Sequence, residues 1–193
     1  MASENRRKLV LVRHSLPQMD RKAQRSLWHL SDEGRRRCDA LAEALAGVEP
    51  RLISSSTEPK AVQTAQIVAE RLDTPHREFE GLHEHDRSNV EFLPAEDFDP
   101  AIAAFFRSPD ELVLGKETAS QAQERFTGAV QAVLAESPDG NVVIVSHGTV
   151  MALFVAKWAG MQAVTLWRRL GLPSLVELSL PEFELVSVTE EIR

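Results

Sequence analysis

Two strand-like apolar runs in this chain each end in a histidine, and this feature constrains the possible folds more than any other. The first run, residues 8–12, leads directly into Arg13 and His14. The second run, residues 141–146, leads into His147 and Gly148. Buried parallel strands have continuous apolar runs of this kind, and open α/β sheets bind ligands beyond the carboxyl ends of such strands. We therefore expect both histidines at one edge of a mostly parallel sheet.

Helix signals alternate with strand signals along the rest of the chain. Ser31 is a typical N-cap, and the acidic residues that follow it suit the first turn of a helix, which Gly47 can end. Further helices are expected near residues 59–72, 119–136 and 148–159, and further strands at 51–54, 76–79, 174–180 and 183–188. This alternation predicts an α/β protein.

The pattern is looser from about residue 73 to 116, where prolines interleave with phenylalanines. We expect a short helix near residues 100–106 and interpret the segment as a lid-like excursion over the site. The 193 residues, 43% of them hydrophobic, suffice for one substantial core. The sequence thus predicts a single domain over residues 1–193 that carries this excursion.

Charge and cysteine content restrict the partners and the compartment. The formal net charge of −7 argues against nucleic acid as a partner, although a pocket in an acidic protein can still attract a small anion. Cys38 is the one cysteine, so nothing in the sequence suggests an oxidising compartment. No apolar run has membrane-spanning length, and Met1–Asn5 lack a signal-type apolar region. We expect a cytoplasmic protein without a membrane partner.

Cationic and imidazole side chains are expected to converge on a phosphate group. If Arg13, His14, Lys60 and His147 meet at one sheet edge with the amides after His147, they form a phosphate-binding arrangement, and Gly148 can let an oxyanion approach the backbone. In such a site His14 can act as the nucleophile. The proton donor should be a carboxyl group in the looser segment, for which Glu84 is the best candidate and Asp86 the second.

Other residues have alternative interpretations. Asp20, Arg87 and Thr149 are candidate contacts for the rest of the substrate, with Trp28 and Arg168 as further candidates. His83 and His85 flank Glu84, and with His14 and His147 they suggest an alternative, a metal-dependent hydrolase. The sequence offers no third ligand at a matching spacing beside the His-x-His pair, so we favour the phosphate interpretation.

Five motifs in order along the chain support a more specific interpretation. They are V-R-H-S at residues 12–15, L-S-D-E-G at 30–34, S-S-T-E-P-K-A-V-Q-T-A at 55–65, L-H-E at 82–84 and V-S-H-G at 145–148. Together they resemble the histidine phosphatase superfamily, in its phosphoglycerate-mutase-like branch. The resemblance covers nearly the whole chain. It implies a three-layer α/β/α sandwich around a mostly parallel sheet, and neither a metal nor another cofactor.

The same resemblance implies a phosphomonoester hydrolase for small phosphorylated substrates that forms a phosphohistidine on His14. Glu84 acts as general acid and then as base, while Arg13, Lys60 and His147 bind the phosphoryl group. Two positions depart from the family pattern: Ser15 replaces a glycine and is expected to contact the ligand, and Lys60 replaces an arginine, which loses the bidentate fork. The alternatives are a low-activity or inactive member that binds phosphorylated ligands and a phosphoglycerate-type mutase, against which the Leu16–Pro17 pair argues.

Overall fold

A six-stranded sheet with the order β3-β2-β4-β1-β5-β6 forms the centre of the computed structural model, which describes residues 6–193. The first four of these strands are parallel, while β5 is antiparallel to β1 and β6 to β5. The strands are β1 (Lys8–Arg13), β2 (Pro50–Ser55), β3 (His76–Glu78), β4 (Asn141–Ser146), β5 (Ser174–Ser179) and β6 (Glu184–Thr189). The predicted mostly parallel sheet is confirmed. The expectation about a signal segment at residues 1–5 lies outside the described residues.

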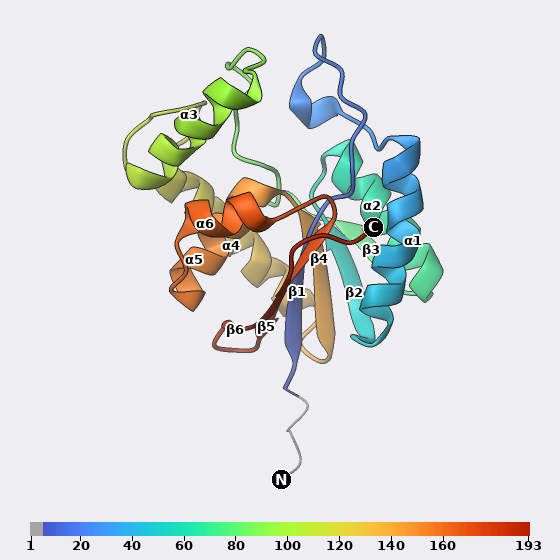
Figure 1. Cartoon of the computed structure of the whole chain (residues 1–193). Coiled ribbons are helices and arrows are strands. Elements are labelled where there is room, and N and C mark those ends of the chain that lie inside the picture. Colours follow the sequence, from blue (N-terminus) through green and yellow to red (C-terminus); the bar gives the residue numbers. More distant parts are fainter. Residues whose placement is uncertain (1–5) are drawn as a thin grey trace.

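Helices cover both faces of this sheet (Figure 1). They are α1 (Asp32–Ala46), α2 (Pro59–Leu72), α3 (Ala95–Arg107), α4 (Ala119–Glu136), α5 (Gly148–Ala159) and α6 (Ala163–Arg169), with a short 3-10 helix η1 (Arg25–Leu27). Alternate residues of β1 enter two separate cores: Val10 and Val12 pack with α1 and α2, and Leu9 and Leu11 pack with α4 and α5. This division confirms the predicted three-layer α/β/α sandwich.

The start of α1 is anchored to the chain that leaves β1. Ser31 caps the helix as predicted, because its side chain accepts a hydrogen bond of 3.0 Å from the amide of Gly34. A Cβ at Gly34 would lie 2.0 Å from the carbonyl oxygen of Leu16, so only glycine permits this close approach. The L-S-D-E-G motif therefore holds the segment that follows His14.

The segment from residue 87 to 115 forms an insert that is closed at its base. The amide of Lys116 donates to the carbonyl oxygen of Asp86 over 2.8 Å, and the Asp86 amide donates to Glu117 Oε1 over 3.0 Å. The expected helix is present in this insert, but α3 begins at Ala95, several residues earlier than predicted, because Pro100 is accommodated inside it. Helix α6 was not predicted at all. Within residues 6–193, every helix is too short or too polar to span a lipid bilayer.

Candidate active site

The strand register brings the two histidine motifs together. Arg13 at the end of β1 pairs with Ser146 at the end of β4, and the amide of His14 donates to the carbonyl oxygen of Ser146 over 2.9 Å. The next residue of each chain segment is a histidine, and the ring centroids of His14 and His147 lie 5.1 Å apart. The sequence prediction of both histidines at one sheet edge is confirmed. The loop after β2 reaches the same edge, since the amide of Ser56 donates to the Val145 carbonyl oxygen over 3.0 Å.

The Nδ1 atom of the His14 ring is hydrogen-bonded to the backbone, and the Nε2 atom is not part of this hydrogen bond. Nδ1 lies 2.7 Å from the carbonyl oxygen of Ser15, and because a carbonyl only accepts, the proton is on Nδ1. Burial lowers the pKa of His14 well below its usual value, and the charges of His147, Lys60 and Arg13 lower it further. At neutral pH the ring is therefore uncharged and presents the lone pair of Nε2, as a nucleophile requires.

His147 is also buried, and its pKa is held low by burial and by the charge of Lys60. Its Nε2 lies 2.8 Å from Ser56 Oγ and 3.5 Å from Glu58 Oε1. Its Nδ1 has no hydrogen-bond partner among the described residues, although the atom is buried. An unsatisfied buried polar atom beside His14 is suited to a ligand oxygen.

Lys60 reaches the site together with a carboxylate that sequence reasoning missed. Its Nζ contacts Glu58 Oε2 and donates to the carbonyl oxygen of Arg25 over 2.9 Å, and the side chains of Lys60 and Glu58 are both buried. The other carboxylate oxygen, Glu58 Oε1, accepts the amide of Glu84 over 2.9 Å. A lysine in the first turn of α2 opposes the helix dipole. That conflict was the available signal that Lys60 needs a buried anionic partner.

Glu84 lies at the N-terminus of α5. Its carboxylate accepts the amides of Thr149 over 3.2 Å and Val150 over 3.3 Å, and Arg87 Nη2 lies 3.6 Å away. Burial acts to raise the pKa of Glu84, but Arg87, His147 and the amide donors more than offset it and lower the pKa to about 2. The sequence predicts that these amides bind a phosphate oxygen; in the structure they bind the carboxylate instead.

Gly148 makes space for Arg13 and does not line the cavity. A Cβ at Gly148 would lie 3.0 Å from Arg13 Nε, so any larger residue would press on the guanidinium. We therefore correct the assignment of Gly148 as a direct phosphate contact. Arg13 itself lines the cavity; it donates from Nη1 to the carbonyl oxygen of Leu170, and its buried Nε has no partner among the described residues.

Two other predicted site residues are placed away from the cavity. The side chain of Ser15 is buried on the side of α1, where Oγ donates to the Gly34 carbonyl oxygen over 2.7 Å. Asp20 is exposed, and its carboxylate accepts the amide of Lys22 over 2.9 Å. Neither lines the cavity, so we remove both Ser15 and Asp20 from the ligand-binding set. Arg168 is also excluded, since it pairs with Asp99 on the surface.

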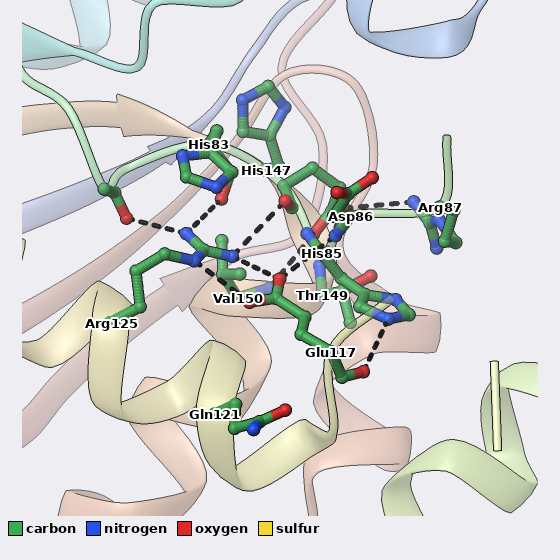
Figure 2. A network of polar contacts seen from close by, with 12 residues as sticks. His83, His85, Asp86, Arg87, Glu117, Gln121, Arg125, His147, Thr149 and Val150 are labelled. Carbon is green, nitrogen blue, oxygen red and sulfur yellow. Dashed lines mark hydrogen bonds and ion pairs between the residues drawn. The ribbon is translucent and has the colours of Figure 1, made fainter. Parts of the chain in front are cut away.

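The loop that carries Glu84 is clamped from α4. Figure 2 shows Arg125 extending toward the backbone of this loop, with Glu117 beside it. Arg125 Nη1 donates to the carbonyl oxygens of Gly81 and His83 over 2.8 and 2.9 Å, and its guanidinium pairs with Glu117. The clamp holds the backbone of the Glu84 loop on α4.

A cavity of about 730 Å³ opens above this sheet edge. Residues at its inner end are Arg13, His14, Glu58, Lys60, Glu84, His147 and Thr149, and residues of its outer walls include Arg25, Trp28, Arg87, Phe92, Phe98 and Trp167. The chain after β1 and the insert thus both contribute walls to the cavity. Across residues 6–193, no three side chains of the ligand-forming types are arranged to hold a metal ion, so the geometry does not assemble the alternative site of four histidines.

A buried imidazole with a free nitrogen, surrounded by cations and a carboxylate at the carboxyl ends of parallel strands, is an arrangement suited to a phosphoryl group. Residues 9–188 match the histidine phosphatase superfamily (branch 1), and the chain belongs to this superfamily. A Bacillus subtilis (strain 168) protein named as the uncharacterized phosphatase PhoE is 26% identical over 131 residues, which are 68% of this chain but only 65% of that relative's length.

Solved structures agree with this assignment. The mycobacterial glucosyl-3-phosphoglycerate phosphatase is 25% identical, with 90% of each chain covered and a TM-score of 0.73. A further structure of that enzyme, in complex with inorganic phosphate, covers 96% of this chain and 98% of its own with a TM-score of 0.76. YhfR of Bacillus stearothermophilus is 24% identical, with coverage of 96% and 98% and a TM-score of 0.77, and shares the fold.

Proposed function

We propose that this protein hydrolyses small phosphomonoesters through a phosphohistidine on His14. The observation that carries this proposal is the hydrogen bond from His14 Nδ1 to the Ser15 carbonyl oxygen, because it directs the Nε2 lone pair of a neutral ring into the cavity. The membership in the superfamily and the phosphatases among its structural relatives support the same reaction class. We keep the cytoplasm as the proposed location.

The phosphoryl oxygens are proposed to bind between Arg13, Lys60 and His147. Each of these side chains lines the cavity beside His14. Arg13 has the buried Nε without a partner and His147 the buried Nδ1, as described above, and both atoms suit a ligand oxygen. These donors neutralise charge on the equatorial oxygens while Nε2 attacks in line.

The reaction then has two steps. In the first, the bond from His14 Nε2 to phosphorus forms, the bond to the leaving oxygen breaks, and Glu84 gives its proton to that oxygen. In the second, Glu84 takes a proton from water, whose oxygen attacks phosphorus. The bond to Nε2 breaks, the proton on Glu84 passes to the phosphate, dihydrogen phosphate leaves, and His14 is again neutral with Glu84 ionised.

The low pKa of Glu84 decides where the first proton comes from. Because the pKa is about 2 in the free protein, the carboxyl group is ionised at neutral pH and holds no proton to donate. A bound phosphate adds negative charge next to the carboxylate, which raises the pKa of Glu84. We propose that the substrate binds with its own proton, as the monoanion, and passes it to Glu84.

An assay of an aryl phosphate with and without a chelator tests the proposal. We expect p-nitrophenyl phosphate to be hydrolysed at neutral pH, at a rate that excess EDTA does not change. Loss of activity in EDTA, restored by a divalent metal, would favour the metal-dependent alternative. Thermal stabilisation by inorganic phosphate without turnover of any substrate in a broad panel would favour a binding protein instead.

Lys60 and Glu58 are expected to act as a pair. We predict that Lys60→Met lowers kcat/KM by about 10²–10³, because it removes a donor to the phosphoryl group and leaves the Glu58 carboxylate uncompensated next to it. The double variant Glu58→Gln/Lys60→Met should recover part of this loss, with a coupling free energy on the order of 1–3 kcal/mol. Steady-state kinetics of the two single variants and the double variant measure this coupling. Additive effects of the two substitutions would show that the pair does not act as a unit.

A further inference from the structure

Two arginines that line the cavity converge on one aromatic ring. The guanidinium carbon of Arg25, on η1, lies 4.7 Å from the centroid of the Phe98 ring, and that of Arg87 lies 5.0 Å from the same centroid. Phe98 belongs to α3 in the insert. We name these three residues the Arg25–Phe98–Arg87 cluster. It lies outside the set of side chains that the proposed reaction uses.

The cluster has hydrogen-bonding capacity that the protein does not use. Arg87 Nη1 is buried and has no hydrogen-bond partner among the described residues. Arg25 donates from Nη2 to the Leu93 carbonyl oxygen at 3.4 Å, the outer limit of a hydrogen bond. Two cations so close together repel each other, and the charge of Arg87 adds to burial in lowering the pKa of Arg25. An anion between them relieves this repulsion and satisfies the open donors.

The position of the cluster relates it to the leaving group. Arg87 Nη2 lies 3.6 Å from Glu84 Oε2, the carboxylate proposed to protonate the leaving oxygen. The backbone of Arg25 is tied to the phosphate end of the cavity, because its carbonyl oxygen accepts the ammonium group of Lys60 over 2.9 Å. Both arginines line the cavity and share the Phe98 ring, so the two guanidinium groups are proposed to border the space just beyond the leaving oxygen.

We infer that the Arg25–Phe98–Arg87 cluster binds a second anionic group of the substrate, a carboxylate or a second phosphate, carried by the leaving group a few bonds from the scissile ester. This inference rests on the proposed function, since it assigns the substrate class of that same site. The protein as a whole has a net charge of −7, so attraction of a dianionic or trianionic substrate depends on this local concentration of positive charge.

A matched series of substrates tests the inference. Hydroxyethyl phosphate, phosphoglycolate and ethylene glycol bisphosphate share one carbon skeleton and end in a hydroxyl, a carboxylate and a second phosphate, and the corresponding propanediol series lengthens the skeleton. We expect the wild-type protein to prefer an anionic member over the hydroxyl member by roughly 10-fold to 100-fold in kcat/KM, since hydrogen bonds to charged groups have about this effect. Which anionic member is preferred distinguishes a carboxylate site from a phosphate site.

The variants are Arg25→Gln, Arg87→Gln and the double substitution, with Arg168→Gln as the matched control. Arg168 is an exposed arginine that pairs with Asp99 and does not line the cavity, so its substitution should leave all rates unchanged. The readout is the ratio of kcat/KM for the anionic member to that for the hydroxyl member within each variant, because this ratio cancels any effect of Arg87 on Glu84. We expect the double variant to bring the ratio close to one while p-nitrophenyl phosphate is still hydrolysed.

Each outcome decides the inference. A wild-type ratio near one on both skeletons, or a ratio that the double variant retains, overturns it. Absence of turnover on every substrate, p-nitrophenyl phosphate included, contradicts the proposed function instead. In that case calorimetric binding of phosphoglycolate and hydroxyethyl phosphate to the wild-type protein tests separately whether the cluster binds a second anionic group. Equal affinities of the two compounds overturn the inference.

Discussion

Replacing His14 by alanine is expected to lower kcat for phosphomonoester hydrolysis by about 10⁴–10⁶, the range typical of losing a covalent nucleophile. The physical reason is that the neutral, buried ring of His14 presents Nε2 to the cavity, whereas the neighbouring His147 has its Nε2 hydrogen-bonded to Ser56. Acid-labile, base-stable phosphate should be trapped on the wild-type protein by rapid quench and be absent from the variant. Steady-state rates and phosphate retention on quenched protein measure both effects.

His29→Ala is the matched control. This histidine is exposed, contacts Gln63 over 2.9 Å, and does not line the cavity. Its removal should leave the rate and the trapped phosphate unchanged. If His14→Ala keeps a tenth or more of the wild-type rate, or if an active wild-type protein traps no phosphate, then water attacks phosphorus directly and the phosphohistidine step is wrong.

Replacing Glu84 by glutamine should have an effect that depends on the leaving group. An alkyl alcohol needs a proton as it departs, so kcat for an alkyl phosphate is expected to fall by about 10²–10⁴. The p-nitrophenolate anion is stable without a proton, so the first step with p-nitrophenyl phosphate, measured as the burst of p-nitrophenolate, should slow much less. Loss of the second step, in which Glu84 takes a proton from water, is common to both substrates. The backbone amides of Thr149 and Val150 donate to different carboxylate oxygens, so the side-chain amide in Glu84→Gln keeps one of these hydrogen bonds and loses the other.

Asp86→Asn distinguishes Glu84 from the second carboxyl candidate of the sequence. The carboxylate of Asp86 accepts the amide of Ser88 over 2.9 Å and turns toward its own loop. We expect this variant to hydrolyse both substrates at nearly the wild-type rate. A large loss with Asp86→Asn on alkyl phosphates, together with an equal effect of Glu84→Gln on the first step with both substrates, would reassign the proton donor to Asp86.

The sheet and the two histidines could be predicted because each depends on local pattern alone. Apolar runs fix where β1 and β4 lie, and the carboxyl ends of parallel neighbours meet at one edge. The helix start at Ser31 depends on a single capping hydrogen bond and was equally readable. In these places local preference and tertiary structure agree.

The site assignments that the structure corrects are those that depend on the direction in which a side chain points. Neighbouring residues of an extended chain point to opposite sides, so with His14 directed into the cavity Ser15 is directed toward α1. Gly148 looked like an opening for an oxyanion, but the space is used by the guanidinium of Arg13 from another strand. The sequence contains no local sign of such an approach between distant segments.

Glu58 and Arg25 were missed for a related reason. A glutamate before a helix and an arginine in a polar loop are ordinarily solvated, and only the fold shows that both are tied to Lys60. The length of α3 was underestimated because Pro100 normally marks a helix start, whereas here it lies inside one. Long-range partners, rather than propensity, determine these features.

Because the insert is closed at its base, selection of the leaving group and breaking of the phosphate ester bond are proposed to lie in different parts of the chain. Because Asp86 and Lys116 are hydrogen-bonded neighbours, residues 87–115 leave and rejoin the scaffold at one point, beyond the clamp that holds Glu84. A designer can therefore exchange residues 88–115, with Phe98 among them, and retarget the molecule to other alcohols while Arg87 stays beside Glu84 and the bond-breaking machinery stays intact. Changes confined to this insert would likewise allow related proteins to evolve toward different phosphorylated substrates.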